Sequence, residues 1–400
     1  MRGHHVASLL APYLDELVAV RRDLHLHPET ARTEVRTTRR VAERLEAAGL
    51  KPALLPGTGL VCEIGHSGPL IALRADLDAL PLSEESGLPY ASAVPGVAHA
   101  CGHDVHTTCL LGAGLVLAEL AAVGGLPGRV RLIFQPAEEV MPGGALDVLT
   151  AGGLQGVERI YALHCDPHTD VGHVGSRVGP ITAAADQVRV RLSGRGGHTS
   201  RPHLTEDVVF ALGQVIVGVP AALSRRIDPR AGAALVWGTV HAGSAANAIP
   251  ARGEVGGTFR CLDSGVWDAA GTLVANAVQE IVRPYGVRAE VVYVRGVPPT
   301  LNDGACVDIL EAAVHAELGP DAVQLAPQSL GGEDFAWMLE KVPGAMFRLG
   351  TRTPGGRTYD LHRPDFQVDE RAIEVGARLL TAIALQDLGQ RCGLTGSVRE

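Results

Sequence analysis

The chain has 400 residues, of which 46% are hydrophobic and 4% aromatic, and its 35 Lys and Arg against 44 Asp and Glu give a net charge of −9. This length and apolar content predict two or three domains with well-buried cores. An acidic chain without Lys and Arg clusters and with few aromatic residues is a poor candidate for binding nucleic acid or an anionic membrane surface, so we expect neither partner.

The sequence carries no recognisable export or membrane signal. Its amino-terminal segment lacks the apolar stretch and small-residue cleavage site of a signal peptide. The longest apolar run, Val208 to Leu223, is interrupted by Gln214 and Pro220 and looks too short to span a bilayer. The seven cysteines are an odd, scattered set, which is not the pattern of a disulfide framework. These features predict a cytoplasmic protein.

Helices and short strands alternate in the first part of the chain. Apolar residues recur at helical spacing over 9–24 and 33–48. Short β-prone runs cover 70–75 and 129–134, and the segment 106–120 between them has the pattern of a helix. This alternation predicts an α/β fold with a mixed, mostly parallel sheet flanked by helices, in which ligands bind at the carboxyl ends of the strands.

The pattern changes after residue 180. The expected elements are a strand at 186–192, a helix at 206–219, strands at 233–240 and 254–259, a helix at 267–282 and a strand at 289–294. The order β-α-β-β-α-β is that of a ferredoxin-like α+β domain. We therefore predict that this domain, 183–296, is inserted into a first domain made of 1–182 and 297–400, which ends with a helix over 370–388.

Cys101 and His103 are separated by a single glycine. In an extended segment, residues i and i+2 point the same way, so both side chains could bind one metal ion. Thiolate and imidazole suit zinc, and also manganese, cobalt or nickel when carboxylates complete the site. Taken alone, the pair could equally be a buried cysteine beside a surface histidine.

Glu138 and Glu139 follow the predicted strand 129–134. Adjacent side chains point in different directions, so one carboxylate can bind a metal while the other acts as general base. Two bound cations would keep both carboxylates ionised. The alternative is an acidic turn in solvent, which the buried strand before the pair and the two glycines after it disfavour.

His164 and His362 each follow a short apolar run. A lone histidine of this kind is more often structural than a ligand, and only the other metal-binding residue types support a ligand role here. Asp76, Asp78 and Asp104 could orient a ligand imidazole by accepting its second N–H, although Asp76 could also lie in a surface turn. One thiolate, three imidazoles and two carboxylates fit a pair of hydrolytic metal ions better than a single structural ion.

The inserted domain offers further candidates. His198, in a Gly-Gly-His-Thr-Ser segment, could donate a hydrogen bond to a developing oxyanion if this domain closes over the metals. Asn247 could do the same or bind a substrate carboxylate, although both could be plain loop residues. Arg260 is a weaker candidate for substrate binding. The glycine turn at Gly332 could line the site or only cap the next helix.

The chain resembles the M20 metallopeptidase family, and within it the amidohydrolase branch of hippurate hydrolases, N-acyl-amino-acid aminoacylases and auxin-conjugate hydrolases. The matching segments span nearly the whole chain in order: RRDLHLHPE, RADLDALP, HACGHDVHTT, QPAEE, ALHCDP, GGHTSRPH, ANAIP, GGEDF and LHRPDF. The resemblance implies a catalytic domain that binds two divalent ions and an inserted lid domain through which a homodimer or a higher homo-oligomer forms.

The resemblance also implies residue roles. The implied metal ligands are Cys101, His103, Glu139, His164 and His362, with Glu138 as the base. His198 and Asn247 match lid residues that meet the substrate. Cys165, Asp166 and Arg363 stand where relatives commonly have other residues. Cys165 and Asp166 could alter the pocket wall, and none of the three differences removes a ligand.

We therefore predict a hydrolase that cleaves the amide bond of an N-acyl amino acid into a carboxylic acid and an amino acid. Two metals, zinc or manganese with cobalt or nickel possible, would activate a water whose proton Glu138 accepts, while one metal and His198 stabilise the oxyanion. A dipeptidase or carboxypeptidase of the same family is the nearest alternative. More remote are a hydrolase with Cys101 as nucleophile, which a chelator would not inhibit, and a non-catalytic metal-binding protein.

Overall fold

The computed structural model describes residues 4–393 and divides into two compact units. The first unit contains the described residues up to Ile181, then Leu301–Pro327 and the described residues from Asp334 onward. The second contains Thr182–Thr300 and Gln328–Glu333. The segment Gln328–Glu333 therefore groups with the inserted part of the chain, whereas the boundaries drawn from the sequence place it in the first domain.

An eight-stranded sheet forms the centre of the first unit, in the order β1-β2-β4-β3-β5-β16-β6-β15. Its strands are β1 Ala53–Leu54, β2 Leu60–Ile64, β3 Leu70–Asp76, β4 Arg129–Gln135, β5 Arg159–Asp170, β6 Val174–Ser176, β15 Val323–Leu325 and β16 Gly344–Arg352. The central run β4-β3-β5-β16 is parallel, as is the pair β6-β15, and the remaining neighbours are antiparallel. The predicted mixed, mostly parallel sheet is thus confirmed.

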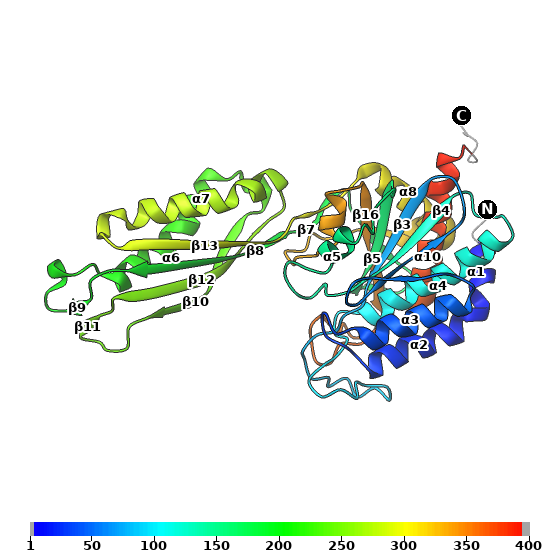
Figure 1. The fold of residues 1–400 in the computed structure, drawn as a ribbon, viewed down its shortest axis with the longest axis horizontal. Coiled ribbons are helices and arrows are strands. Elements are labelled where there is room, and N and C mark those ends of the chain that lie inside the picture. The colour runs from blue at the N-terminus through cyan, green and yellow to red at the C-terminus, as the bar shows by residue number, and fades with distance from the viewer. Residues whose placement is uncertain (1–3, 394–400) are drawn as a thin grey trace. The chain divides into compact units, whose positions relative to one another are not determined.

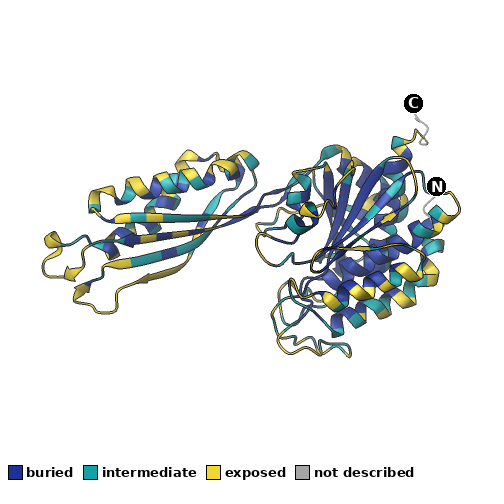
Figure 2. Ribbon diagram, viewed as in Figure 1, coloured by how far each residue is buried: buried dark blue, intermediate teal, exposed yellow. Residues whose placement is uncertain are grey.

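Helices flank this sheet (Figure 1). They are α1 His4–Leu10, α2 Leu14–Leu26, α3 Val35–Ala47, α4 His103–Ala122, α5 Ala145–Thr150, α8 Gly304–Leu318, α9 Ala336–Leu339 and α10 Arg371–Arg391. The single helix predicted over 9–24 is divided, because Pro12 lacks the N–H that would continue α1 and a 3-10 turn at Ala11–Tyr13 intervenes. The long apolar helix α4 is almost entirely buried (Figure 2).

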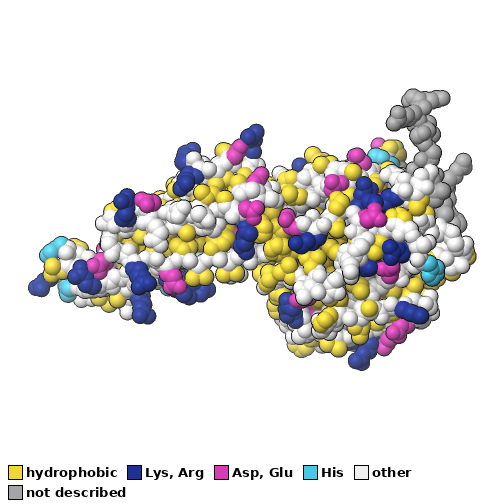
Figure 3. All heavy atoms as spheres, turned by 45° about the horizontal axis from the view of Figure 1, so that its top comes forward, with side chains coloured by type: hydrophobic (Ala, Val, Ile, Leu, Met, Phe, Trp, Pro, Cys, Tyr) yellow, Lys and Arg dark blue, Asp and Glu magenta, His cyan; other side chains and the backbone are white. Residues whose placement is uncertain are grey.

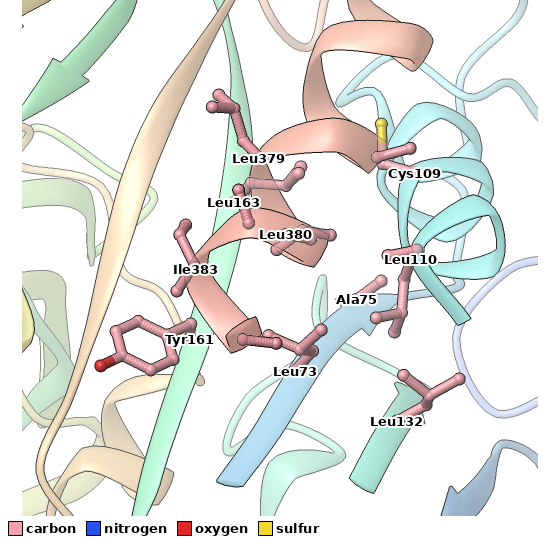
Figure 4. Packing of buried hydrophobic residues seen from close by; sticks show 14 of the residues in the cluster. Leu73, Ala75, Cys109, Leu110, Leu132, Tyr161, Leu163, Leu379, Leu380 and Ile383 are labelled. Carbon is pink, nitrogen blue, oxygen red and sulfur yellow. The ribbon is translucent and has the colours of Figure 1, made fainter. Parts of the chain in front are cut away.

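The two faces of the sheet carry different side chains toward their carboxyl ends. On one face, side chains of β3, β4 and β5 pack against α4 and α10 (Figure 4); they include Leu73, Ala75, Leu132, Tyr161 and Leu163. On the opposite face, Ala72, Ile133, Ala162 and Met346 form a second apolar cluster. Because side chains alternate along a strand, the next positions on this second face are polar: Arg74, Gln135, His164 and Arg348. The second face thus becomes polar at the carboxyl ends of the strands.

The second unit contains a four-stranded antiparallel sheet in the order β10-β12-β8-β13, with two helices packed on it. Its elements are β8 Ala184–Ser193, α6 Val208–Arg226, β10 Ala234–Ala242, β12 Arg252–Cys261, α7 Ser264–Val282 and β13 Arg288–Val297. This β-α-β-β-α-β order confirms the predicted ferredoxin-like fold. The chain passes to and from this unit through the paired strands β7 Gly179–Thr182 and β14 Thr300–Asn302.

Helix α6 continues through Pro220 to Arg226, so the predicted end near Val219 is wrong. A proline lacks an N–H, which leaves the carbonyl of Ile216, four residues earlier, without its helical donor. The indole Nε1–H of Trp237, on β10, donates to this carbonyl at 3.2 Å. The sheet therefore supplies the hydrogen bond that the helix lacks.

At its full length, α6 is long enough to cross a membrane. By length and composition alone, α4 and α6 could each cross a membrane, contrary to the expectation that the apolar run in α6 is too short. In the structure, α4 is a core helix of the first unit. Helix α6 packs Val208, Leu212, Val215 and Val219 into the second unit.

Candidate metal centre

Cys101 and His103 lie at the junction between a loop and α4. Gly102 precedes the helix with φ 89°, in the left-handed region, so the expectation that the pair lies in an extended segment is wrong. A Cβ atom at Gly102 would lie 2.7 Å from the Sγ of Cys165, which leaves room only for glycine. A left-handed turn, and not strand alternation, brings the two side chains to the same place.

The five predicted ligands form one cluster in the first unit. The ligand atoms of Cys101, His103 and His164 lie within 4.8 Å of one another, and so do those of Cys101, Glu139 and His362. The Sγ of Cys101 is 3.6 Å from Nε2 of His164, and Oε1 of Glu139 is 3.2 Å from Nε2 of His362. Cys101 belongs to both groups, so it would help to hold either of two ions.

Hydrogen bonds fix how two of the histidines face the cluster. Nδ1 of His103 lies 2.8 Å from the carbonyl oxygen of Asp78, and Nδ1 of His164 lies 2.8 Å from that of Cys165. A carbonyl only accepts, so each Nδ1 carries a hydrogen that it donates, which leaves Nε2 as the ring nitrogen that can be free of a proton. Nε2 is therefore the atom that both rings offer to a metal.

Two buried polar atoms support a cation at this place. Nε2 of His103 and Oε1 of Glu139 are buried, and among residues 4–393 neither has a partner in hydrogen-bonding geometry, although Nε2 of His362 lies 3.2 Å from the carboxylate oxygen. Nε2 of His103 lies 3.9 Å from the same oxygen. Buried polar atoms are rarely left unpaired, and a cation between these two would satisfy both. The donors present therefore fit divalent metal ions.

Protons occupy several of these groups when no metal is bound. Burial raises the pKa of the Cys101 thiol, and the nearby carboxylate of Glu139 raises it further. Burial opposes protonation of His103, but Asp76, Cys101 and Asp78 together outweigh it and raise the pKa of His103 well above its usual value. Burial lowers the pKa of His164, which is therefore neutral. Because metals bind deprotonated ligands, metal binding must release protons from this site.

Asp78 holds the turn that carries the two glutamates. Its Oδ1 accepts the backbone N–H of Glu138 at 3.0 Å, and its Oδ2 accepts that of Glu139 at 2.9 Å. The predicted contact between Asp78 and a ligand imidazole is also present: Nδ1 of His103 lies 2.8 Å from the carbonyl oxygen of Asp78 and 3.4 Å from its carboxylate. One buried residue thus positions three side chains of the cluster.

Asp104 lies elsewhere than predicted. Its Oδ2 is 2.8 Å from Nε of Arg21 and 2.7 Å from Nδ1 of His25, and neither residue is a predicted ligand. Although burial opposes it, the charge of Arg21 keeps the pKa of Asp104 well below its usual range. Within the described residues, no hydrogen bond joins its carboxylate to a ligand imidazole. Asp104 therefore fixes the first turn of α4 against α2.

A buried network next to the cluster includes a residue that the sequence analysis did not single out, His106. Nδ1 of His106 is 2.6 Å from Oδ1 of Asp76, and Oδ2 of Asp76 accepts from Nη1 of Arg74 at 2.6 Å. Nη2 of Arg74 donates to Asp334 at 2.8 Å. The available signal was helical spacing, because His106 follows His103 by three residues and so shares its face of α4.

The candidates of the second unit lie in two places. His198 and Asn247 are neighbours, since Ala248 pairs with His198 and the N–H of Thr199 donates to the carbonyl of Asn247 at 3.2 Å. Nδ1 of His198 accepts the N–H of Ser200 at 3.1 Å, so its Nε2 carries a hydrogen that it can donate.

Arg260 and Gly332 belong to the other place. Arg260 pairs with Ala185 near the end of β12 and donates to the carbonyl of Leu330, close in the chain to Gly332. Asn247 lies shortly before the opposite end of β12, at Arg252, and its neighbour His198 lies shortly after Ser193 of β8, which pairs with Arg252. The structure therefore does not gather the four candidates of this unit in one site.

A family model described as peptidase family M20/M25/M40 matches residues 72–386. The chain belongs to this family. Membership confirms the family predicted from the motifs and the prediction of a metal-dependent hydrolase.

Two curated relatives and one solved structure are among the similar proteins. A protein of Rhodococcus jostii (strain RHA1), provisionally named a glutamate–cysteine ligase, is 52% identical over 374 residues, which are 92% of this chain and 47% of that protein. This chain thus spans about half the length of that relative. The N-acetylcysteine deacetylase of Bacillus subtilis (strain 168) is 38% identical over 373 residues, 92% of this chain and 96% of the deacetylase.

The solved structure is the YxeP protein of Bacillus subtilis, described as a dinuclear metal binding peptidase from the M20 family. It is 36% identical, with a TM-score of 0.84, and the match covers 94% of this chain and 99% of that one. This similarity and the two ligand groups that share Cys101 support two divalent ions in this chain as well.

Proposed function

We propose that this chain hydrolyses the amide bond of N-acyl amino acids, releasing a carboxylic acid and an amino acid. The observation that carries the proposal is the pair of ligand groups sharing Cys101, with a second carboxylate, Glu138, outside both groups. Carboxylate oxygens of Glu138 and Glu139 and a ring nitrogen of His103 lie within 4.8 Å of one another. Glu138 is thus close enough to the ligands to move a proton at the reacting centre.

When bound, two divalent ions, zinc or manganese, lower the pKa of a coordinated water and polarise the amide carbonyl. Glu138 accepts a proton from the attacking water and returns it to the leaving nitrogen. Asp78 fixes the backbone of Glu138 and Glu139 together, so the base keeps its place beside its neighbouring ligand. We assign to His198 the donation of its Nε2–H to the substrate oxyanion.

The remaining candidates are proposed to bind substrate: Asn247, Arg260 and Gly332. N-acetylcysteine is the first compound to test, because a relative that is 38% identical and matches this chain over 92% of its length carries the name N-acetylcysteine deacetylase. Dipeptides and peptides with a free carboxyl terminus cover the alternative of a dipeptidase or carboxypeptidase.

The test measures amine release from this panel by protein that has been stripped of metal and reloaded with zinc or manganese. Reloaded wild type should cleave N-acyl amino acids, and a chelator should abolish the activity, which a cysteine nucleophile would survive. Glu138→Ala should bind metal like wild type and lose about 10²- to 10⁴-fold in turnover. Glu43→Ala, an exposed carboxylate on α3, is the matched control and should retain full turnover. Normal turnover by metal-loaded Glu138→Ala would remove Glu138 from the mechanism.

We also propose a cytoplasmic homodimer that forms through the second unit. Exposed apolar side chains lie on α6 and on β10, the edge strand of its sheet: Val209, Phe210, Val217, Val236 and Val240. Figure 3 shows hydrophobic side chains between the charged ones over this unit. Exposed apolar surface next to an unpaired strand edge favours association. Sedimentation should give twice the 41.8 kDa of one chain, and a monomer across the concentration range would contradict the proposal.

A further inference from the structure

His106 is a buried histidine whose two ring nitrogens are both engaged. Nδ1 lies 2.6 Å from Oδ1 of Asp76, and Nε2 lies 2.8 Å from the backbone nitrogen of Cys165. The amide of Cys165 can only donate, so Nε2 accepts and Nδ1 carries the hydrogen that is donated to Asp76. His106 is therefore a neutral ring in one defined tautomer.

The sheet explains why the amide of Cys165 needs this partner. Strand β3 pairs with β5 only as far as Ala162, while β16 pairs with β5 well beyond Cys165. Past Ala162, one edge of β5 has lost its strand neighbour, and a buried N–H there would be left unpaired. The imidazole of His106 takes the place of the missing strand.

The backbone of the same residue, Cys165, also holds a metal ligand. The carbonyl of Cys165 accepts the Nδ1–H of His164 at 2.8 Å, and this bond turns Nε2 of His164 toward Cys101. The N–H of Cys165 is bound to His106, whose ring lies 5.0 Å from that of His164 between centroids. Any rotation of this backbone would therefore disturb the orientation of His164.

We propose that His106 is a positioning residue of the metal centre, which holds His164 in its ligand orientation through the backbone of Cys165. Arg74 and Asp76 complete the support, because Arg74 holds the carboxylate that receives the Nδ1–H of His106. The inference rests on the proposed metal centre.

His106 itself is not a ligand, although its ring, Asp76 and His103 bring three possible ligand atoms within 4.8 Å of one another. Nε2 of His106 would have to give up the amide of Cys165 to bind a metal. Asp76 is likewise held by Arg74. A buried amide left without an acceptor is unfavourable, so the positioning role is favoured over ligation.

Two amide substitutions separate the two hydrogen bonds of His106. The side chain of His106→Asn reaches about as far as Nδ1, so it can donate to Asp76 but does not reach Cys165. His106→Gln reaches about as far as Nε2, so its oxygen can accept the N–H of Cys165. If the proposal is correct, only the Asn variant should lose the orientation of His164.

The probe is cobalt alone, titrated into metal-free protein and followed by its thiolate charge-transfer and ligand-field absorption. Wild type should bind two ions. His106→Asn should bind one of them about 10- to 100-fold more weakly with altered ligand-field bands, as for other residues that orient metal ligands, and His106→Gln should stay near wild type. Tyr161 lies on the same strand as His164, and Tyr161→Phe removes its 2.6 Å hydrogen bond to Asp387 of α10; this variant is the control for general destabilisation and should leave cobalt affinity unchanged.

Equal cobalt affinities for the Asn and Gln variants, whether both like wild type or both weakened, would overturn the role of the Cys165 amide. Wild type that binds no cobalt would overturn the metal centre itself, and this inference with it. If the variants do not fold, nitrogen NMR of wild-type His106 provides the test. The Nδ1–H tautomer is expected, and the Nε2–H tautomer would overturn the proposal.

Discussion

At the scale of single residues, Asp78 shows how one buried carboxylate holds two others in place. Its two oxygens accept the neighbouring N–H groups of Glu138 and Glu139, and its carbonyl accepts from His103. The carboxylates of the two glutamates are thereby left to face the cluster. A side chain with only one accepting oxygen cannot serve both amides.

Asp78→Asn therefore tests this arrangement. The amide nitrogen of Asn cannot accept, so one glutamate N–H loses its partner, which should lower the free energy of unfolding by about 1–3 kcal/mol. Metal affinity should fall about 10- to 100-fold because the turn loses its fixed position. Urea denaturation and cobalt titration measure the two effects. Wild-type values in both would show that Asp78 does not hold the turn.

His99 should make stability depend on pH. Its ring is buried and, within residues 4–393, neither nitrogen has a hydrogen-bond partner; burial lowers the pKa of His99 to about 4. The unfolded chain takes up this proton near pH 6.5, whereas the folded chain takes it up only near pH 4. The folded chain therefore keeps its full stability with respect to His99 above pH 6.5. As pH falls toward 4, protonation of His99 in the unfolded chain lowers the free energy of unfolding by about 3 kcal/mol at most.

The measurement compares urea unfolding of metal-free wild type and His99→Phe at pH 7 and pH 4.5. Phe cannot take up a proton, so the variant should lose less stability than wild type on acidification. Equal losses for the two proteins would mean that His99 does not cause this dependence.

The sequence predicted which side chains meet in the ligand cluster, but not the backbone turns and backbone hydrogen bonds that hold them. Residue types and their places after apolar runs suggested that Cys101, His103, Glu139, His164 and His362 meet, and the structure brings them together. The left-handed turn at Gly102 was not predicted, because a glycine permits such a turn without requiring it. The partner of His106 is a backbone amide 59 positions away, and no sequence pattern marks it.

At the scale of elements, Pro220 and Trp237 form a compensating pair. The proline removes the N–H that would bond to Ile216, and the indole supplies one from β10. Trp237→Phe should cost about 1 kcal/mol for this hydrogen bond, besides any loss of packing. In the Pro220→Ala background, the helix regains its own donor, so the same change should cost less. A double-mutant cycle of unfolding free energies measures the difference. Zero coupling would show that the two residues act independently.

The same pair illustrates which elements the sequence predicts. In long helices and central strands, apolar residues recur often enough to show the helical or strand spacing, and the predicted long helices and central strands are present in the structure. The edge strands β1 and β15 and the neighbouring strand β6 have only two or three residues, which is too short for any period. The extension of α6 past Pro220 depends on a tryptophan in a different element, so the helix end could not be predicted locally.

At the scale of the whole molecule, metal binding should stabilise the fold and release protons. Ions that bind only the folded chain stabilise it by about 2.7 kcal/mol at a free concentration 100 times the dissociation constant. Since Cys101 and His103 hold protons without metal, affinity should rise with pH. Calorimetric titration in buffers of different ionisation enthalpy measures the released protons. A melting temperature that a chelator does not lower, or binding without proton release, would contradict this account.

The strand pair β7 and β14 closes the base of the inserted unit, and the hydroxyls of Thr182 and Thr300 lie 2.5 Å apart there. The chain between Thr182 and Thr300 can therefore be treated as a loop whose two ends lie at nearly the same point. The first unit therefore needs no particular length of chain between its own two parts, and closing a longer loop would cost only slightly more entropy. Insertions, deletions or exchange of the second unit can thus be accommodated without altering the order of strands around the metal ligands.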